Sequence, residues 1–298
     1  MSSQAETISA AAAGTVELSA GVRVNRLGYG AMRITGPGVW GPPKDRASAL
    51  AVLRRTVELG INFIDTADSY GPGVSEELIA EALHPYPGDL MIATKGGWNR
   101  PAPGHWSHDA SPKHLREAVE GSLKRLRLDR IELYQLHTPD PAISFEASME
   151  ALVDLRAKGK INMIGLSNVT REHIERAQRM TKIVSVQNRY SVFDREWEHV
   201  LEYCEHNHIV FIPWFPLGAG GVGHDILSRV AEAHHAKPIQ VALAWLLQRS
   251  PIMLPIPGTS SVEHLEEDVV AANIRLSEEE FRQLDQVQGK TTAGRVRG

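Results

Sequence analysis

Short apolar runs alternate with longer segments of helical periodicity from about residue 28 to the end of the chain. This alternation is typical of βα units that build a parallel sheet. Eight runs are predicted as strands, at residues 27–32, 62–65, 90–95, 131–137, 161–166, 183–187, 209–214 and 253–256. Because no Pro- or Ser-rich linker interrupts them, they predict an α/β fold with a single (β/α)8 TIM barrel over residues 1–298, rather than a doubly wound sheet with a second domain.

The segments between these strands carry helix-boundary signals. In the predicted helix at 112–126, Ser111 is a candidate N-cap and Pro112 takes the first helical position. A second predicted helix, at 145–158, is followed by Gly159 as its stop signal. Helices of this length between strands support the barrel.

Additions are expected at both ends of the barrel. Residues 15–24, "TVELSAGVRV", predict an N-terminal β-hairpin that closes the barrel floor. Ser277 and Glu280 form a capping-box pattern that predicts an extra C-terminal helix. Residues 1–14 are expected to be flexible.

Composition favours an ordinary soluble globular protein, for which a reducing compartment is unexceptional. The net charge is −4 and no basic block stands out, which argues against nucleic acid or a membrane as partner. Cys204 is the only cysteine, so no intrachain disulfide can form. Neither a secretory signal nor a run of about 18 apolar residues is present. A cytoplasmic monomer or small homo-oligomer is the expectation.

The stretch "DTADSYG" places a carboxylate, Asp65, at the end of a buried strand and a phenol, Tyr70, just beyond it. In a (β/α)8 barrel the C-terminal ends of the strands form one face, so Lys95 and His137 from the next two strands would lie nearby. Lys95 is the expected partner of Asp65, because a buried charge needs one. Its positive charge would also favour the ionised form of the phenol.

Other readings of these residues remain open at this point. Asp65 and Lys95 could form an ordinary structural ion pair. His105, His108 and Asp109 have a spacing that could hold a metal, as in a barrel metallohydrolase, although they lie in a loop and we expect no metal site. A third reading is a subunit that binds a cofactor without useful turnover.

Five motifs, "DTADSYG", "IATKGG", "LYQLHTPD", "IGLSNVT" and "QNRY", occur in order between about residues 27 and 284 and together resemble the aldo-keto reductase family. The resemblance implies a barrel that binds NADPH without a Rossmann unit and reduces aldehydes or ketones. It implies that Tyr70 donates a proton, that Asp65 and Lys95 tune it, and that His137 orients the carbonyl oxygen. Such a site suits the negative charge that develops on that oxygen.

The same resemblance implies where the cofactor binds. The family's nicotinamide, pyrophosphate and adenosine-phosphate positions correspond here to Gly30, Met32, Ser167, Asn168, Gln187, Trp214, Leu217, Gly218, Gly258, Thr259, Ser260, His264, Glu267 and Asp268. The aromatic residue that stacks on the nicotinamide ring could be Phe215 instead of Trp214. His264 stands where an Arg often holds the 2′-phosphate, and Asp268 replaces a frequent Asn. We therefore expect NADPH as cofactor, with NADH usable but weaker.

The resemblance to the aldo-keto reductase family implies that the substrate is a small carbonyl compound. Trp40, Trp98 and Trp106 fall in loops after the first and third strands and are predicted to wall an apolar pocket. The first loop, "GPGVWGPP", resembles a bacterial subgroup that includes pyridoxal reductases, so pyridoxal is the first substrate to try.

Overall fold

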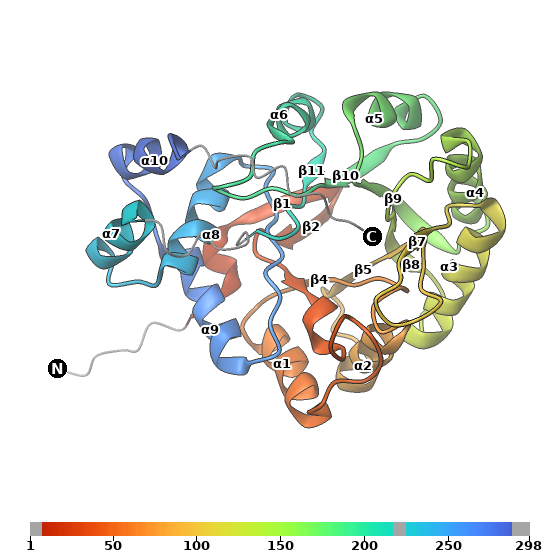
Figure 1. The fold of residues 1–298 in the computed structure, drawn as a ribbon, viewed down its shortest axis with the longest axis horizontal. Helices are drawn as coiled ribbons and strands as arrows, with labels where there is room; N and C mark the ends of the chain where they lie inside the picture. Colours follow the sequence, from red (N-terminus) through yellow and green to blue (C-terminus); the bar gives the residue numbers. More distant parts are fainter. Residues whose placement is uncertain (1–7, 217–224, 288–298) are drawn as a thin grey trace.

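The computed structural model describes residues 8–216 and 225–287. Its main sheet holds seven strands, which run parallel to one another in the order β11-β10-β9-β8-β5-β4-β3. Figure 1 shows the strands inside a ring of helices. Their bounds are β3 Tyr29–Gly30, β4 Phe63–Asp65, β5 Met91–Gly96, β8 Ile131–Leu136, β9 Ile161–Ser167, β10 Ile183–Gln187 and β11 Val210–Phe211.

The barrel is closed by residues 252–257, the place of the predicted eighth strand. This segment accepts hydrogen bonds from Gly28 N and Gly30 N, each 3.0 Å long, and Leu254 N donates to Phe211 O at 2.9 Å on the other side. A regular strand had been predicted here, but the structure has only a single bridge, between Phe211 and Met253. Prolines 251, 255 and 257 lack the N–H groups that a ladder needs. The fold is nevertheless a (β/α)8 barrel.

The outer ring consists of helices that carry their apolar faces toward the strands. α3 begins after Ser111, whose hydroxyl accepts a hydrogen bond from His114 N, so the predicted N-cap is confirmed. The helices are α1 Arg46–Glu58, α2 Val74–Leu83, α3 Pro112–Leu126, α4 Phe145–Ala157, α5 Arg171–Gln178, α6 Glu198–His206, α7 Asp225–Ala233, α8 Pro238–Arg249, α9 Val262–Val270 and α10 Glu278–Asp285. None of the described helices is long and apolar enough to cross a membrane.

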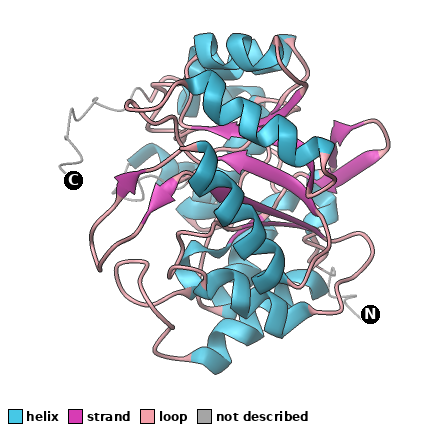
Figure 2. Cartoon of the chain, turned by 90° about the vertical axis from the view of Figure 1, so that its right-hand side faces the viewer, coloured by secondary structure: helices cyan, strands magenta, loops and turns pink. Residues whose placement is uncertain are grey.

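Short strand pairs lie at the two ends of the barrel (Figure 2). β1 Thr15–Ser19 and β2 Val22–Asn25 form the predicted antiparallel hairpin, with Gly21 at a φ of 76° in its turn. Apolar residues of this hairpin pack among inward-facing strand residues such as Phe63 and Leu133, so the hairpin closes the barrel floor. β6 Trp98–Asn99 and β7 Ser107–His108 form a second antiparallel pair, in the loop after β5.

Both termini carry short helices. α10 has the predicted capping box, in which Ser277 and Glu280 exchange hydrogen bonds. Ala10–Ala13, inside the segment expected to be flexible, instead forms a 3-10 helix with Ala10 fully buried and its N–H bonded to Leu59 O at 2.8 Å. Burial of the apolar Ala10 side chain and this long-range bond fix a segment whose sequence carries little local signal.

Two predicted strands are shorter than expected. The chain leaves β3 after Gly30 and turns into a 3-10 helix, η2 Ala31–Ile34, which contains Met32. β11 ends at Phe211, two residues before Pro213. Irregular backbone at the carboxyl ends of strands is where a barrel forms its loops.

Candidate active site

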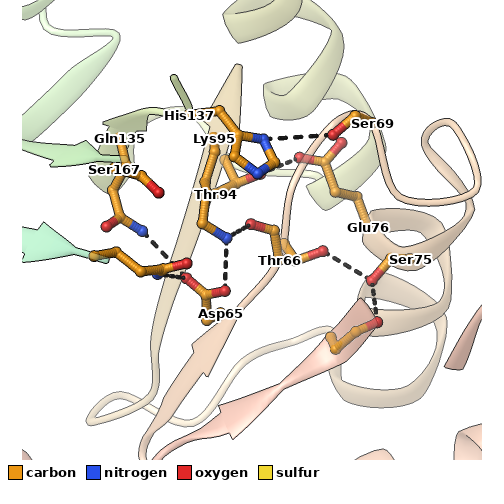
Figure 3. A network of polar contacts seen from close by, with 12 residues as sticks. Asp65, Thr66, Ser69, Ser75, Glu76, Thr94, Lys95, Gln135, His137 and Ser167 are labelled. Carbon is orange, nitrogen blue, oxygen red and sulfur yellow. Dashed lines mark hydrogen bonds and ion pairs between the residues drawn. The ribbon is translucent and has the colours of Figure 1, made fainter. Parts of the chain in front are cut away.

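The four predicted catalytic side chains lie together at the carboxyl end of the barrel. Asp65 is the last residue of β4, Lys95 lies near the end of β5, and His137 follows β8. Tyr70 comes from the loop between β4 and α2 and contacts the His137 ring edge to face, with 5.9 Å between ring centroids. Figure 3 shows Asp65, Lys95 and His137 converging from neighbouring strands.

Asp65 and Lys95 form a buried ion pair. Lys95 Nζ lies 2.6 Å from Asp65 Oδ2, and their side chains are 0% and 2% exposed, respectively. Lys95 Nζ also donates to the backbone oxygen of Thr66 at 2.8 Å. Burial alone would lower the pKa of Lys95, but Asp65 and Tyr70 outweigh it and raise that pKa. Lys95 is therefore a permanent cation at neutral pH.

Two amides complete the environment of Asp65, and Figure 3 labels one of them, Gln135. Gln135 Nε2 and Gln187 Nε2 both donate to Asp65 Oδ1, at 3.1 and 2.8 Å. The carboxylate thus accepts from three side chains on three different strands, which fixes its position. Gln135 is absent from the sequence-based set. Strand alternation could have found it, because it lies two residues before His137 and so points to the same side of β8.

Tyr70 is a neutral phenol that lies against the lysine. Lys95 Nζ lies 5.2 Å from the centroid of its ring. Burial raises the pKa of Tyr70, and Lys95 offsets this rise only in part. Lys95 lowers the pKa of the phenol, as its charge predicts, but burial has the larger effect, because removing a phenolate from water costs more. Tyr70 therefore retains its proton at neutral pH and can donate it.

His137 is also neutral. Burial, followed by the positive charge of Lys95, lowers the pKa of His137 well below its usual value. Its Nδ1 lies 3.5 Å from the hydroxyl of Ser69. A neutral imidazole beside a neutral phenol gives the site two hydrogen-bond donors that can converge on one acceptor oxygen.

The side chains predicted to hold the nicotinamide surround this cluster. Asn168 has a φ of 56° and donates through Nδ2 to His137 O at 3.0 Å. Its Oδ1 accepts from Trp214 Nε1, also at 3.0 Å. Ser167 is bonded to Asn168 Nδ2 at 3.2 Å, and Gln187 joins the set through Asp65. Hydroxyl and amide groups of this kind suit a carboxamide, and the Trp214 indole offers a flat face. Leu217 and Gly218 lie outside the described residues.

The predicted adenosine-phosphate residues lie at the start of α9. Ser261 is the N-cap of α9 and accepts a hydrogen bond from His264 N at 3.4 Å. The exposed Ser260 and His264 side chains flank this helix end, and Tyr29 Oη donates to Thr259 O at 2.6 Å. The Thr259 and Ser261 hydroxyls accept from backbone N–H groups and can still donate, so this helix N-terminus can bind an anion.

The two acids assigned to this part of the site differ in their surroundings. The Glu267 carboxylate is bonded to Lys237, the residue before α8, so it is already occupied. Asp268 is 4% exposed, and burial, with a smaller contribution from Glu267, raises the pKa of Asp268 to about 7. Asp268 is therefore protonated in a large fraction of molecules at neutral pH, and a protonated carboxyl can donate as well as accept.

Gly30 and Gly258 have a structural reason to be glycine. A Cβ on Gly30 would lie 2.7 Å from Ile256 O, and one on Gly258 would lie 2.5 Å from Gly30 O. Glycine is therefore required at both positions, where β3 meets the closing segment of the barrel. Met32, in η2, is partly buried.

The predicted substrate tryptophans approach the site from two loops. Trp98 contacts His137 at 6.3 Å and Trp106 at 5.8 Å between ring centroids. Trp106 is 37% exposed. Trp40 and Trp106 both lie against the guanidinium of Arg100, which the sequence analysis did not single out.

The residues considered for a metal do not form a site. His108 stacks on Trp98 with 4.3 Å between ring centroids, whereas Asp109 Oδ2 lies 3.7 Å from His114 Nδ1 of α3. Within residues 8–216 and 225–287, no three His, Cys, Asp or Glu side chains are grouped closely enough to hold a metal ion.

Comparisons with known proteins agree with this geometry. The Aldo/keto reductase family matches residues 26–288. An oxidoreductase of Schizosaccharomyces pombe is 49% identical over 95% of this chain and 92% of its own length. Pyridoxine 4-dehydrogenase of Escherichia coli is 46% identical over 88% of this chain and 94% of its own length. An aldo/keto reductase of Klebsiella pneumoniae, solved with NADP and acetate, superposes with a TM-score of 0.78 at 28% identity, covering 92% of this chain and 95% of the other. The chain therefore belongs to the aldo/keto reductase family and is an NAD(P)H-dependent enzyme of that family.

Proposed function

We propose that this enzyme uses NADPH to reduce the carbonyl group of an aldehyde or ketone to an alcohol. The observation that carries the proposal is the buried Asp65–Lys95 pair beside Tyr70 and His137. Two neutral donors above a fixed cation suit a reaction in which negative charge develops on one oxygen. The same cluster gives no support to hydrolysis, which would need an activated water.

Each side chain has a separate role in this proposal. The Tyr70 hydroxyl and a neutral His137 ring nitrogen donate hydrogen bonds to the carbonyl oxygen. When bound, the reduced nicotinamide supplies the hydride that adds to the carbonyl carbon. The Tyr70 proton then passes to the oxygen, and Lys95 stabilises the phenolate that remains. Asp65 keeps Lys95 charged and in place.

The surroundings of α9 favour NADPH over NADH. Glu266 is paired with Arg55 at 2.7 Å and Glu267 with Lys237, so their negative charges are compensated. The exposed side chain of Arg33 passes beside Gly258, with its Cγ 3.7 Å from where a Cβ would lie. A 2′-phosphate at the helix N-terminus would therefore meet hydroxyls, backbone N–H groups and a cation.

Pyridoxal is the substrate that we propose testing first, with pyridoxine for the reverse direction. Pyridoxine 4-dehydrogenase is 46% identical to this chain, and Trp98 provides an aromatic surface beside His137. A flat aromatic aldehyde suits such a surface.

The decisive test is Tyr70→Phe. This substitution removes the proton donor and leaves the ring, so we expect the reduction rate of pyridoxal to fall by about 100-fold or more, while NADPH still binds. Stopped-flow absorbance of NADPH oxidation and a fluorescence titration of NADPH measure the two quantities. Tyr86→Phe is the matched control, because that hydroxyl bonds Leu126 O away from the site. Wild-type-like turnover in Tyr70→Phe would refute the role.

The cofactor preference is tested by kcat/KM for NADPH and NADH. We expect NADPH to be preferred by roughly tenfold or more, equivalent to about 1.4 kcal/mol per tenfold. His264→Arg should enlarge the preference several-fold, because a guanidinium is a permanent cation that can bind a phosphate through two hydrogen bonds. His206→Arg, on the exposed end of α6, is the control. A preference for NADH would show that the phosphate-site assignment is wrong, and would leave the catalytic assignment intact.

A further inference from the structure

Arg100 connects three separate loops at the carboxyl end of the barrel. It follows β6, and 7% of its surface is exposed. Its Nε donates to His105 O in its own hairpin at 3.1 Å. Its Nη1 donates to Val39 O, in the loop after β3, and to Ser69 O, in the loop after β4, both at 3.1 Å. Its Nη2 donates to Gly38 O at 3.3 Å.

Two predicted substrate tryptophans lie against the same guanidinium. The Cζ atom of Arg100 lies 3.6 Å from the ring centroid of Trp106 and 5.4 Å from that of Trp40. No carboxylate pairs with Arg100 among the residues that the structure describes. Burial lowers the pKa of Arg100, although a guanidinium stays charged at any working pH. Four carbonyls and two aromatic faces offset the cost of burying this charge.

The loops that Arg100 joins include the residues next to the proton donor. Ser69 precedes Tyr70, and its hydroxyl lies 3.5 Å from His137 Nδ1. The loops after β3 and β4 are also bonded to each other, through Gly41 N to Gly71 O at 3.0 Å and Gly71 N to Val39 O at 3.2 Å. Arg100 adds the β6–β7 hairpin to this pair.

We propose that Arg100 is a positioning residue that holds these three loops together as one wall of the carbonyl pocket, and so sets both the fit of the substrate and the placement of Tyr70. The proposal rests on the proposed function for its kinetic consequences. Lysine cannot replace arginine here, because an ammonium group has three donors at one point, whereas the planar guanidinium reaches four carbonyls in three directions.

Arg26 provides a matched control near the barrel floor. Its guanidinium also donates to backbone carbonyls only, those of Leu247 and Ser250 at 2.5 Å and Met253 at 3.3 Å. These bonds join Arg26, the residue after β2, to the end of α8 and to the closing segment, near the floor of the barrel that the hairpin closes. Both arginines therefore satisfy carbonyls, but only Arg100 does so around the site.

The experiment compares Arg100→Met, Arg100→Lys and Arg26→Met in the full-length enzyme. We expect Arg100→Met to raise the KM for pyridoxal by roughly tenfold and to lower kcat several-fold, with the Kd for NADPH within about twofold of wild type. Arg100→Lys should recover less than half of the loss. Arg26→Met should lower Tm and leave KM and kcat within about twofold.

Amide hydrogen exchange supplies a readout that does not need activity. Peptides spanning residues 36–43, 66–73 and 101–109 should exchange faster in both Arg100 variants and not in Arg26→Met. Unchanged kinetics in the Arg100 variants would overturn the proposal, and so would unchanged exchange. A wild-type protein that reduces no carbonyl compound would refute the proposed function alone; exchange in the three loops would then decide whether Arg100 holds them.

Discussion

Two buried carboxylates lie close together in the sequence and make similar bonds in very different places. Asp65 pairs with Lys95 at 2.6 Å, and Glu76 pairs with Arg125 at 2.7 Å; the two carboxylate side chains are 2% and 0% exposed. Asp65 ends β4 and faces the barrel interior. Glu76 lies on α2, where it joins Arg125 of α3 and accepts from Thr94 of β5 at 2.6 Å.

The difference arises at two consecutive residues of β5. Successive side chains of a strand point to opposite faces, so Lys95 points inward and Thr94 points outward. Figure 3 shows both contacts on the same strand. The inner pair lies beside Tyr70, whereas the outer pair ties two helices to the sheet. An ion pair is therefore not informative by itself, and the side of the sheet on which it lies decides its role.

The largest expected effect is on the inner pair. Lys95→Met should lower the rate of carbonyl reduction by about 100-fold or more, because it removes the charge that stabilises the Tyr70 phenolate and leaves Asp65 without its cation. Since Lys95 lowers the pKa of Tyr70, the alkaline limb of any residual activity should move to higher pH. The pH dependence of single-turnover reduction tests this. An unmoved limb would contradict the role of Lys95.

An intermediate effect is expected for the outer pair, on stability rather than rate. Arg125→Met leaves Glu76 buried without a cation, so the free energy of unfolding should fall by about 3 kcal/mol. The kcat should stay within about twofold of wild type, since no contact of Arg125 reaches the site. Denaturant unfolding and steady-state kinetics measure the two effects. A tenfold loss of kcat without loss of stability would erase the distinction between the pairs.

The smallest expected effect concerns Asp68, which lies between the two pairs. Burial, with a further contribution from Glu76, raises the pKa of Asp68 to about 8. A carboxyl whose folded-state pKa is raised stabilises the fold below its unfolded pKa, and this contribution is lost as pH rises through about 8. We therefore expect the Tm difference, Asp68→Asn minus wild type, to be larger at pH 9 than at pH 5, by roughly 2 °C or more. Thermal scans at both pH values check the sign, and a constant difference would contradict it.

Much of the site was predictable because parallel strands align their carboxyl ends. Asp65, Lys95 and His137 each end a predicted strand, and strand order alone brings them together. The lowering of the Tyr70 pKa by Lys95 was predicted, but the larger rise from burial was not, because the cost of burying a phenolate depends on how deeply the loops cover the ring. Arg100 gave no signal, since its partners are backbone carbonyls, which no sequence pattern identifies.

The sequence by itself determined the barrel, the hairpin at its floor, the capped C-terminal helix and the meeting of Asp65 with Lys95 and His137. These features follow from local periodicity, capping residues and strand order, which act over short stretches of chain. Tertiary structure alone decided that Glu76 pairs with Arg125 and that Arg100 joins three loops. Each of these depends on groups far apart in sequence, whose burial and distance are set only when the whole barrel has packed.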